Sequence, residues 1–101
     1  MQEKKLRIPR KKISEFCRRW AVVEFSLFGS ALRPDFRPDS DVDVLVEFAP
    51  NAHIGWEIIQ IQDELAALFG GRAIDLVTYK ALNPHIRPQV LASAVTLYEQ
   101  R

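Results

Sequence analysis

The spacing at which apolar residues recur changes several times along the chain, and each change predicts a new helix or strand. Apolar residues recur at helical spacing after Pro9, a residue favoured at the first helical position, and again after His53. These patterns predict helices over residues 9–20 and 54–69, the second ended by Gly70-Gly71. The apolar positions are Ile13, Phe16, Cys17 and Trp20 in the first helix and Ile54, Ile58, Ile61, Leu65 and Leu68 in the second.

Alternation of apolar and polar residues predicts strands over residues 22–28, 42–48 and 72–79. In the first strand, one face should carry Val23, Phe25 and Leu27, and the other Val22, Glu24, Ser26 and Phe28. Another helix is predicted over residues 88–94, while residues 95–99 fit either its continuation or a short edge strand. The expected fold class is α/β (α+β), a small mixed sheet with helices packed on one face.

Composition places the chain among globular proteins. Its 101 residues fit a single domain, 1–101, in which residues 1–8 are expected to be flexible. No apolar stretch approaches the ~20 residues that span a bilayer, and the N-terminus has no apolar signal segment. The lone Cys17 lies in an apolar helical pattern and is expected to be a buried thiol. We expect a cytoplasmic protein with no membrane contact.

Charge is unevenly distributed although the formal net charge is only +1. Residues 1–19 hold eight of the 14 lysines and arginines. A solvated helix face with a loose tail is the favoured interpretation, and a surface for phosphate, RNA or an acidic partner is the alternative. No aromatic residues are interleaved in support of RNA, so direct nucleic-acid binding is not expected.

Candidate chemistry lies between residues 25 and 46. Asp41 and Asp43 are one residue apart in a strand pattern, so both side chains should project from the same face, and this face should stay open to solvent. Adjacent like charges repel unless a cation lies between them, and carboxylate oxygens suit Mg2+ or Mn2+. Gly29-Ser30, after the first strand, offers backbone N–H groups and a hydroxyl to a phosphate. The pattern suggests a metal-assisted nucleotide site.

Two later residues need an interpretation of their own. Asp75 lies on the face of Ala73, Val77 and Tyr79 in an apolar strand, where an unpartnered carboxylate is costly to bury. A strand-end aspartate bound by a lysine or a backbone amide is the plain alternative, but the earlier Asp pair favours a functional role. Trp56 is expected in the core or in an interface. An exposed apolar patch, with Trp56 or the C-terminal segment in it, is expected to mark a partner surface.

These motifs together resemble the DNA polymerase beta nucleotidyltransferase superfamily. The resemblance rests on GSALR, a loop, SDVDVLVEF and a later strand with IDLV, and it covers residues 10–99. Within the superfamily the chain is similar to the minimal nucleotidyltransferase (MNT) domains. These are often encoded beside HEPN-domain proteins, and some act as antitoxins. The implied fold is the nucleotidyltransferase fold.

The resemblance assigns roles to individual residues. Gly29 and Ser30 match the pair that binds the nucleotide phosphates. Asp41 and Asp43 match the carboxylates that hold two divalent metals, Mg2+ or Mn2+, and Asp75 matches the third carboxylate, which holds only the catalytic metal.

One further match lies in the loop. Arg33 matches the basic residue of the motif GSxxR, and it is followed by Pro34 where relatives often have glycine. This departure stiffens the loop without removing a chemical group.

The resemblance also implies an activity. We expect a Mg-dependent transfer of AMP from ATP to a hydroxyl, a tyrosine on a partner HEPN toxin, by an antitoxin. The alternative is a non-catalytic or nucleotide-sensing antitoxin that neutralises its partner by binding. An antibiotic- or RNA-directed transferase is a third interpretation, against which the small size argues. A homo- or hetero-oligomer is left open.

Overall fold

A computed structural model describes residues 8–32 and 41–100 of the protein. Its elements are, in order, α1 (Arg10–Arg19), β1 (Val22–Phe28), the 3-10 helix η1 (Gly29–Leu32), β2 (Val42–Phe48), α2 (Glu57–Leu68), β3 (Ile74–Thr78), α3 (Arg87–Ser93) and β4 (Val95–Glu99). The prediction of a flexible N-terminus falls, except for residue 8, outside the described residues, and so do Arg33 and Pro34.

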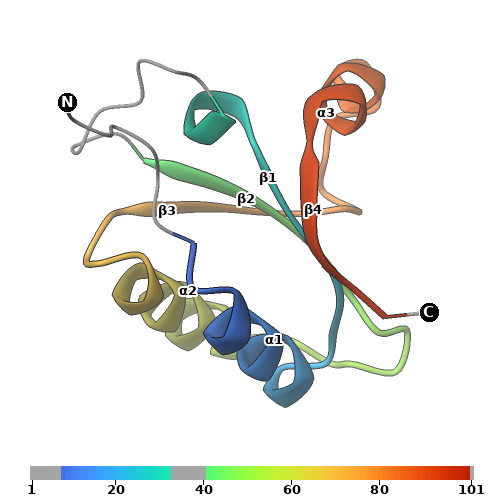
Figure 1. Ribbon diagram of the computed structural model, residues 1–101. Helices are drawn as coiled ribbons and strands as arrows, with labels where there is room; N and C mark the ends of the chain where they lie inside the picture. Colours follow the sequence, from blue (N-terminus) through green and yellow to red (C-terminus); the bar gives the residue numbers. More distant parts are fainter. Residues whose placement is uncertain (1–7, 33–40, 101) are drawn as a thin grey trace, which may run out of the picture.

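One mixed sheet in the strand order β3-β2-β1-β4 organises these elements. β1 runs antiparallel to both β2 and β4, whereas β2 and β3 are parallel. A parallel pair requires a crossover, which α2 supplies. Both α1 and α2 cover the same face of the sheet (Figure 1). The predicted fold class is thus confirmed.

The core lies between that face and the two helices. Val42, Val44 and Val46 point into it from β2, in the alternation expected of a strand with one buried face. The rings of Phe16 in α1 and Phe25 in β1 meet edge to face, with centroids 6.2 Å apart. This packing confirms the predicted helices, although the second begins at Glu57 rather than at residue 54.

One face assignment in β1 is wrong. The register between β1 and β2 shifts between Val22 and Glu24, which indicates a β-bulge. Val22 therefore turns into the core, where it is buried, while Val23 is only half-buried. Beyond the bulge the predicted alternation holds, because Phe25 and Leu27 are both buried in the core.

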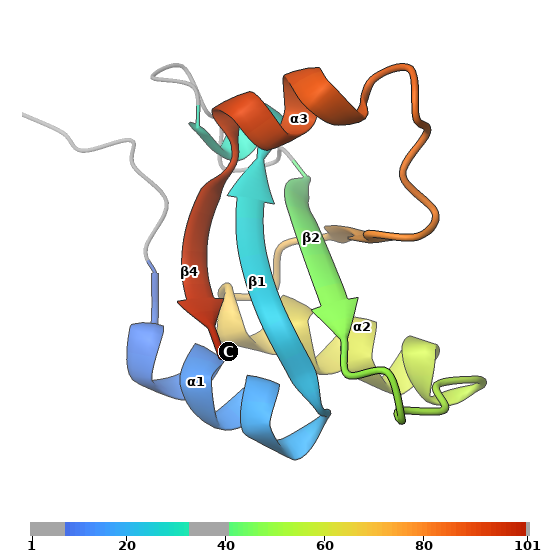
Figure 2. The same cartoon turned by 90° about the vertical axis from the view of Figure 1, so that its right-hand side faces the viewer.

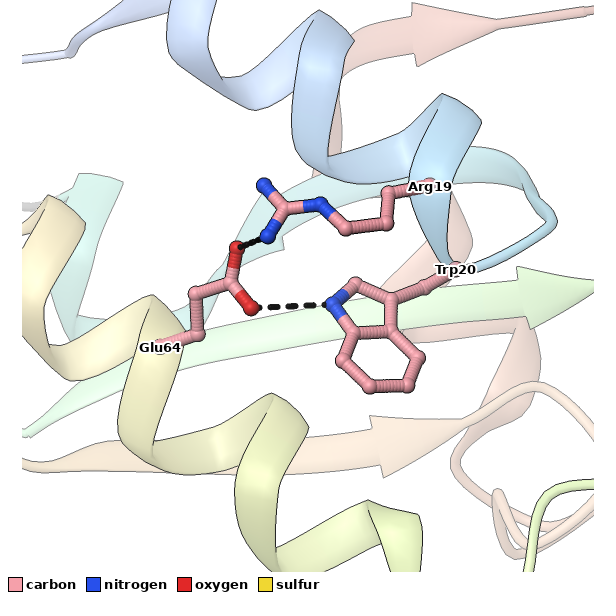
Figure 3. Close-up of polar contacts among 3 residues, drawn as sticks. All are labelled: Arg19, Trp20 and Glu64. Carbon is pink, nitrogen blue, oxygen red and sulfur yellow. Dashed lines mark hydrogen bonds and ion pairs between the residues drawn. The ribbon is translucent and has the colours of Figure 1, made fainter.

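The carboxylate of Glu64 in α2 contacts two residues at the C-terminal end of α1 (Figure 3). Glu64 accepts a hydrogen bond from Trp20 Nε1 at 3.0 Å, and its other oxygen lies 2.6 Å from Arg19 Nη1. The ion pair is partly exposed and is expected to stabilise the fold by less than about 1 kcal/mol. Its main consequence is geometric, since it fixes the C-terminal end of α1 against the middle of α2.

Cys17 is fully buried in the core, as its sequence pattern predicts. Burial raises the pKa of its thiol to about 12, and the nearby positive charge of Arg18 offsets this only in part. The nucleophilic thiolate is therefore almost absent at neutral pH. None of the described helices combines the length and apolarity needed to cross a membrane.

A thiol reagent should accordingly leave the native protein unmodified. At pH 8 we expect no reaction of Cys17 with dithionitrobenzoate over minutes, and release of one equivalent of chromophore once guanidinium unfolds the chain. The absorbance of the released thiolate measures both. Rapid reaction in the native state would show that this part of the core opens readily.

Candidate active site

The Asp pair lies where β2 begins. Asp43 is half-buried within the strand, and Asp41 is exposed just before it. Because Val42 and Val44 are completely buried against the helices, the alternating residues 41 and 43 belong to the opposite face. The pair therefore shares one face, as its spacing predicts.

Asp75 lies beside this pair. The parallel register of β2 and β3 places Asp75 directly opposite Asp43. Neighbouring strands are about 4.8 Å apart, so the two aspartates are next to each other although 32 positions separate them in sequence. Asp75 is exposed, which excludes the costly burial that would have required a protein partner. A half-buried and an exposed carboxylate thus lie side by side.

Gly29 brings the first motif to the same place. It follows Phe28, the residue of β1 that pairs with Asp43. Gly29 has a φ of +66°, a backbone conformation that residues with a side chain rarely adopt. A methyl group at this position would overlap Asp43 Oδ2. The glycine thus makes room for the carboxylate. Ser30 follows in the backbone of η1, but its side chain lies outside the described part of the structure.

The face that carries the aspartates is open only at that end. Further along it, Leu45 and Ser26 are 4% and 2% exposed, and neither belongs to the core under the helices. The Ser26 hydroxyl donates a hydrogen bond to Thr96 Oγ1 at 3.3 Å. The expectation of a face open along its whole length is therefore wrong, because this side of the sheet has a small packed layer of its own.

Residues after β3 belong to this second layer. Leu82 is buried, and its carbonyl oxygen accepts a hydrogen bond from Arg87 Nη2 at 2.9 Å. The guanidinium carbon of Arg87 lies 5.5 Å from the centre of the Tyr79 ring, a cation–π distance. Apolar residues on the Asp-bearing faces of β2 and β3, such as Leu45, are the sequence signal for this layer.

The donor chemistry and the backbone register fit a divalent cation. Carboxylate oxygens are the ligands that Mg2+ and Mn2+ prefer, and the like charges of Asp43 and Asp75 favour a cation between them. Within residues 8–32 and 41–100, however, no three carboxylate, histidine or cysteine side chains are gathered tightly enough to hold one ion. Asp43 and Asp75 are the two predicted ligands that the strand register brings together.

Replacing Gly29 by alanine should disturb Asp43 more than the fold. The positive φ should cost roughly 1–2 kcal/mol of stability, and the new methyl group should displace the Asp43 carboxylate. We expect a loss of nucleotide transfer that exceeds the loss of folded protein. Gly70→Ala is the matched control, since its φ is +74° and a methyl group there meets nothing within 4 Å. Equal transfer by the two variants, measured beside thermal melts, would contradict the proposed contact.

A mixed sheet in which Gly29 lies against Asp43, with Asp75 opposite Asp43 on the neighbouring strand, is the arrangement expected of a nucleotidyltransferase. The family model for polymerase beta nucleotidyltransferases matches residues 11–101, and the chain belongs to this family.

Individual relatives agree with this assignment. Protein adenylyltransferase MntA of Thermococcus cleftensis is 37% identical over 81 residues, which are 80% of each chain. A solved structure described as a minimal nucleotidyltransferase is 32% identical, with a TM-score of 0.72 over 85% of this chain and 86% of its own. The sequence-based assignment to the MNT domains is confirmed.

A third relative resembles this chain in fold alone. It is the MNT antitoxin in a complex with a tri-AMPylated HEPN toxin of Shewanella oneidensis. Its sequence is 20% identical, and the TM-score is 0.64 over 90% of this chain and 70% of the other.

Proposed function

We propose that the chain transfers AMP from ATP to a tyrosine hydroxyl of a HEPN-domain toxin and so acts as its antitoxin. The observation that carries this proposal is the meeting of Gly29, Asp43 and Asp75 at one end of the sheet. A protein that neutralised its partner by contact alone would have no use for like charges held side by side at a cost in stability.

The relatives support the acceptor as well as the chemistry. One is named a protein adenylyltransferase, and another is an MNT antitoxin bound to a HEPN toxin that carries AMP groups. These descriptions concern the relatives, and they make a protein hydroxyl the first acceptor to test for this chain.

The reaction forms one bond and breaks another. The acceptor oxygen bonds to the α-phosphorus of ATP, and the bond from that phosphorus to the bridging oxygen breaks, so that pyrophosphate leaves. Asp41 and Asp43 would hold two Mg2+ ions, and Asp75 would hold the one beside the acceptor. Bound Mg2+ would supply positive charge to the phosphate oxygens.

The chain's own residues position the reactants. Backbone N–H groups at Gly29 and Ser30 would bind the phosphates of the nucleotide, and the φ of Gly29 lets the turn approach Asp43 closely. Asp75, exposed at the open end of the sheet, would orient the incoming hydroxyl and take up its proton.

Labelled ATP tests the proposal. The chain is incubated with Mg2+, ATP labelled in the α-phosphate, and a HEPN-domain protein from the same genome. We expect the label to appear on a tyrosine of that protein, and pyrophosphate to be released in equal amount. Tight binding of the two proteins without transfer of label would instead favour an antitoxin that acts by contact.

A further inference from the structure

The C-terminal part of the chain exposes apolar side chains that the described residues leave uncovered. No side chain of α3 is buried, and Leu91 in its middle is 38% exposed. Ile86 before the helix and Val95 after it are each 46% exposed. Residues 88–98 contain no charged side chain, although 27% of the whole chain is charged. We call α3, with the exposed residues Ile86, Leu91 and Val95 on and beside it, the α3 surface. Ile86 and Leu91 are five helical positions apart, so they point to different sides of this exposed helix.

The α3 surface lies at the end of the sheet that holds the aspartates. Val95 pairs with Leu27 in β1, and the next residue of β1, Phe28, pairs with Asp43. Two strand spacings, about 10 Å, separate the start of β4 from the start of β2. Figure 2 shows α3 crossing the end of the sheet where β1 finishes and where β2 and β4 begin.

A second exposed apolar patch lies far from the site. Trp56 and Ile59, at the start of α2, are 88% and 58% exposed. Next to them a cavity of about 570 Å3 is lined by residues that include Phe48, Ile54 and Ile58. This patch follows the far end of β2, five residues beyond Asp43, which corresponds to roughly 17 Å along the strand.

An acceptor protein must bring its hydroxyl to Asp43 and Asp75. An interface centred on α3 includes the entrance to these residues, whereas one centred on Trp56 has its middle about 17 Å away. The centres of protein interfaces are also depleted of charged residues, and this matches the uncharged segment 88–98. Leu32, which follows the Gly-Ser turn in η1, adds a further apolar side chain at this end, 37% exposed.

We propose that the α3 surface is where the protein that carries the acceptor hydroxyl docks, through an apolar and uncharged face of its own. The inference rests on the proposed function, because a partner that is modified must reach the aspartates. It adds the place of contact and the chemistry of the partner's surface. Docking there would cover α3 and set the acceptor beside Asp75.

A charge placed at each patch tests the proposal. Leu91→Asp puts a carboxylate into the α3 surface, and Ile59→Asp puts the same group into the exposed patch on α2. The full chain is assayed for binding to the same HEPN-domain protein without ATP, for transfer of AMP to that protein, and for Mg·ATP affinity. Circular dichroism checks the fold, and Leu91→Gln replaces Leu91→Asp if the latter does not fold.

We expect Leu91→Asp to weaken binding of the HEPN protein at least tenfold and to slow transfer in parallel, with Mg·ATP affinity unchanged. Leu91→Gln should weaken the same binding at least threefold, and Ile59→Asp should change nothing. The proposal would be overturned if the Leu91 variants bound the HEPN protein as tightly as the wild type does. It would also be overturned if Ile59→Asp lost this binding. So would an effect confined to self-association of this chain. A wild-type chain that binds the HEPN protein without transferring AMP would refute the proposed function, while the binding assay would still test the docking surface.

Discussion

Asp43→Asn should abolish nucleotide transfer while leaving the protein folded. Asp43 faces away from the helices, so the substitution removes charge without disturbing the core. Asparagine keeps the shape of the side chain, but it cannot neutralise a cation. We expect the rate of AMP transfer to fall by about 10³-fold, in the range seen when one electrostatic contact to a transition state is lost.

A second carboxylate variant controls for the change in net charge. Asp63 is exposed on α2, a helix that packs on the other face of the sheet. Asp63→Asn removes the same charge and should transfer AMP at the wild-type rate. If both variants slow transfer to a similar extent, the effect arises from overall charge rather than from the proposed site.

Asp75→Asn should separate binding from chemistry. If Asp75 holds only the metal beside the acceptor, the variant should bind Mg·ATP with near-normal affinity. Its transfer rate should still fall by ~10²-fold or more, because only transition-state stabilisation is lost. Calorimetry with ATP and Mg2+ measures the first quantity, and labelled transfer the second. Normal transfer, or loss of Mg·ATP binding in a folded variant, would refute this division of roles.

The same variant should show the cost of the paired charges. Like charges directly opposite each other on neighbouring strands destabilise a sheet, and the register places Asp75 opposite Asp43. Asp75→Asn should therefore raise the melting temperature of the metal-free protein at low salt. Added Mg2+ should stabilise the wild type more than the variant, so the difference between their melting temperatures should become smaller. A lower melting temperature without metal would mean that Asp75 makes a stabilising contact.

Strands and their buried faces could be predicted from the sequence because each has one apolar side. Val42, Val44 and Val46 point into the core as their alternation indicates, and this fixed the face of Asp41 and Asp43. The bulge at Val22 could not be predicted, since one extra residue in a strand leaves no mark in a short apolar run.

The sequence pattern does not predict which distant segments pair with each other in the sheet. The pattern predicts the face of the strand on which Asp75 lies but not the residue that it pairs with. Only the parallel pairing of β2 with β3 places Asp75 beside Asp43. The contact of Gly29 with Asp43 likewise depends on where β1 ends. Residues 95–99 fitted both a helix and a strand, and pairing with β1 decides for the strand β4.

Solvent exposure was predicted in part. Trp56 was expected in the core or in an interface, and its exposed side chain excludes the core. The sequence predicts an exposed apolar patch at Trp56 or at the C-terminal segment, and the structure has exposed apolar side chains at both places. The sequence could not show that this patch shares an end of the sheet with the aspartates.

Paramagnetic broadening by Mn2+ locates the metal without requiring catalysis, and it therefore tests whether Asp43 and Asp75 form the metal site. Mn2+ is added in small steps, with ATP, to the isotopically labelled protein, and the loss of each amide signal is followed by NMR. We expect the amide signals of Gly29, Asp43 and Asp75 to broaden first and the indole signal of Trp56 to persist. Broadening that begins at α1 or at Trp56 and spares Asp43 and Asp75 would contradict this expectation.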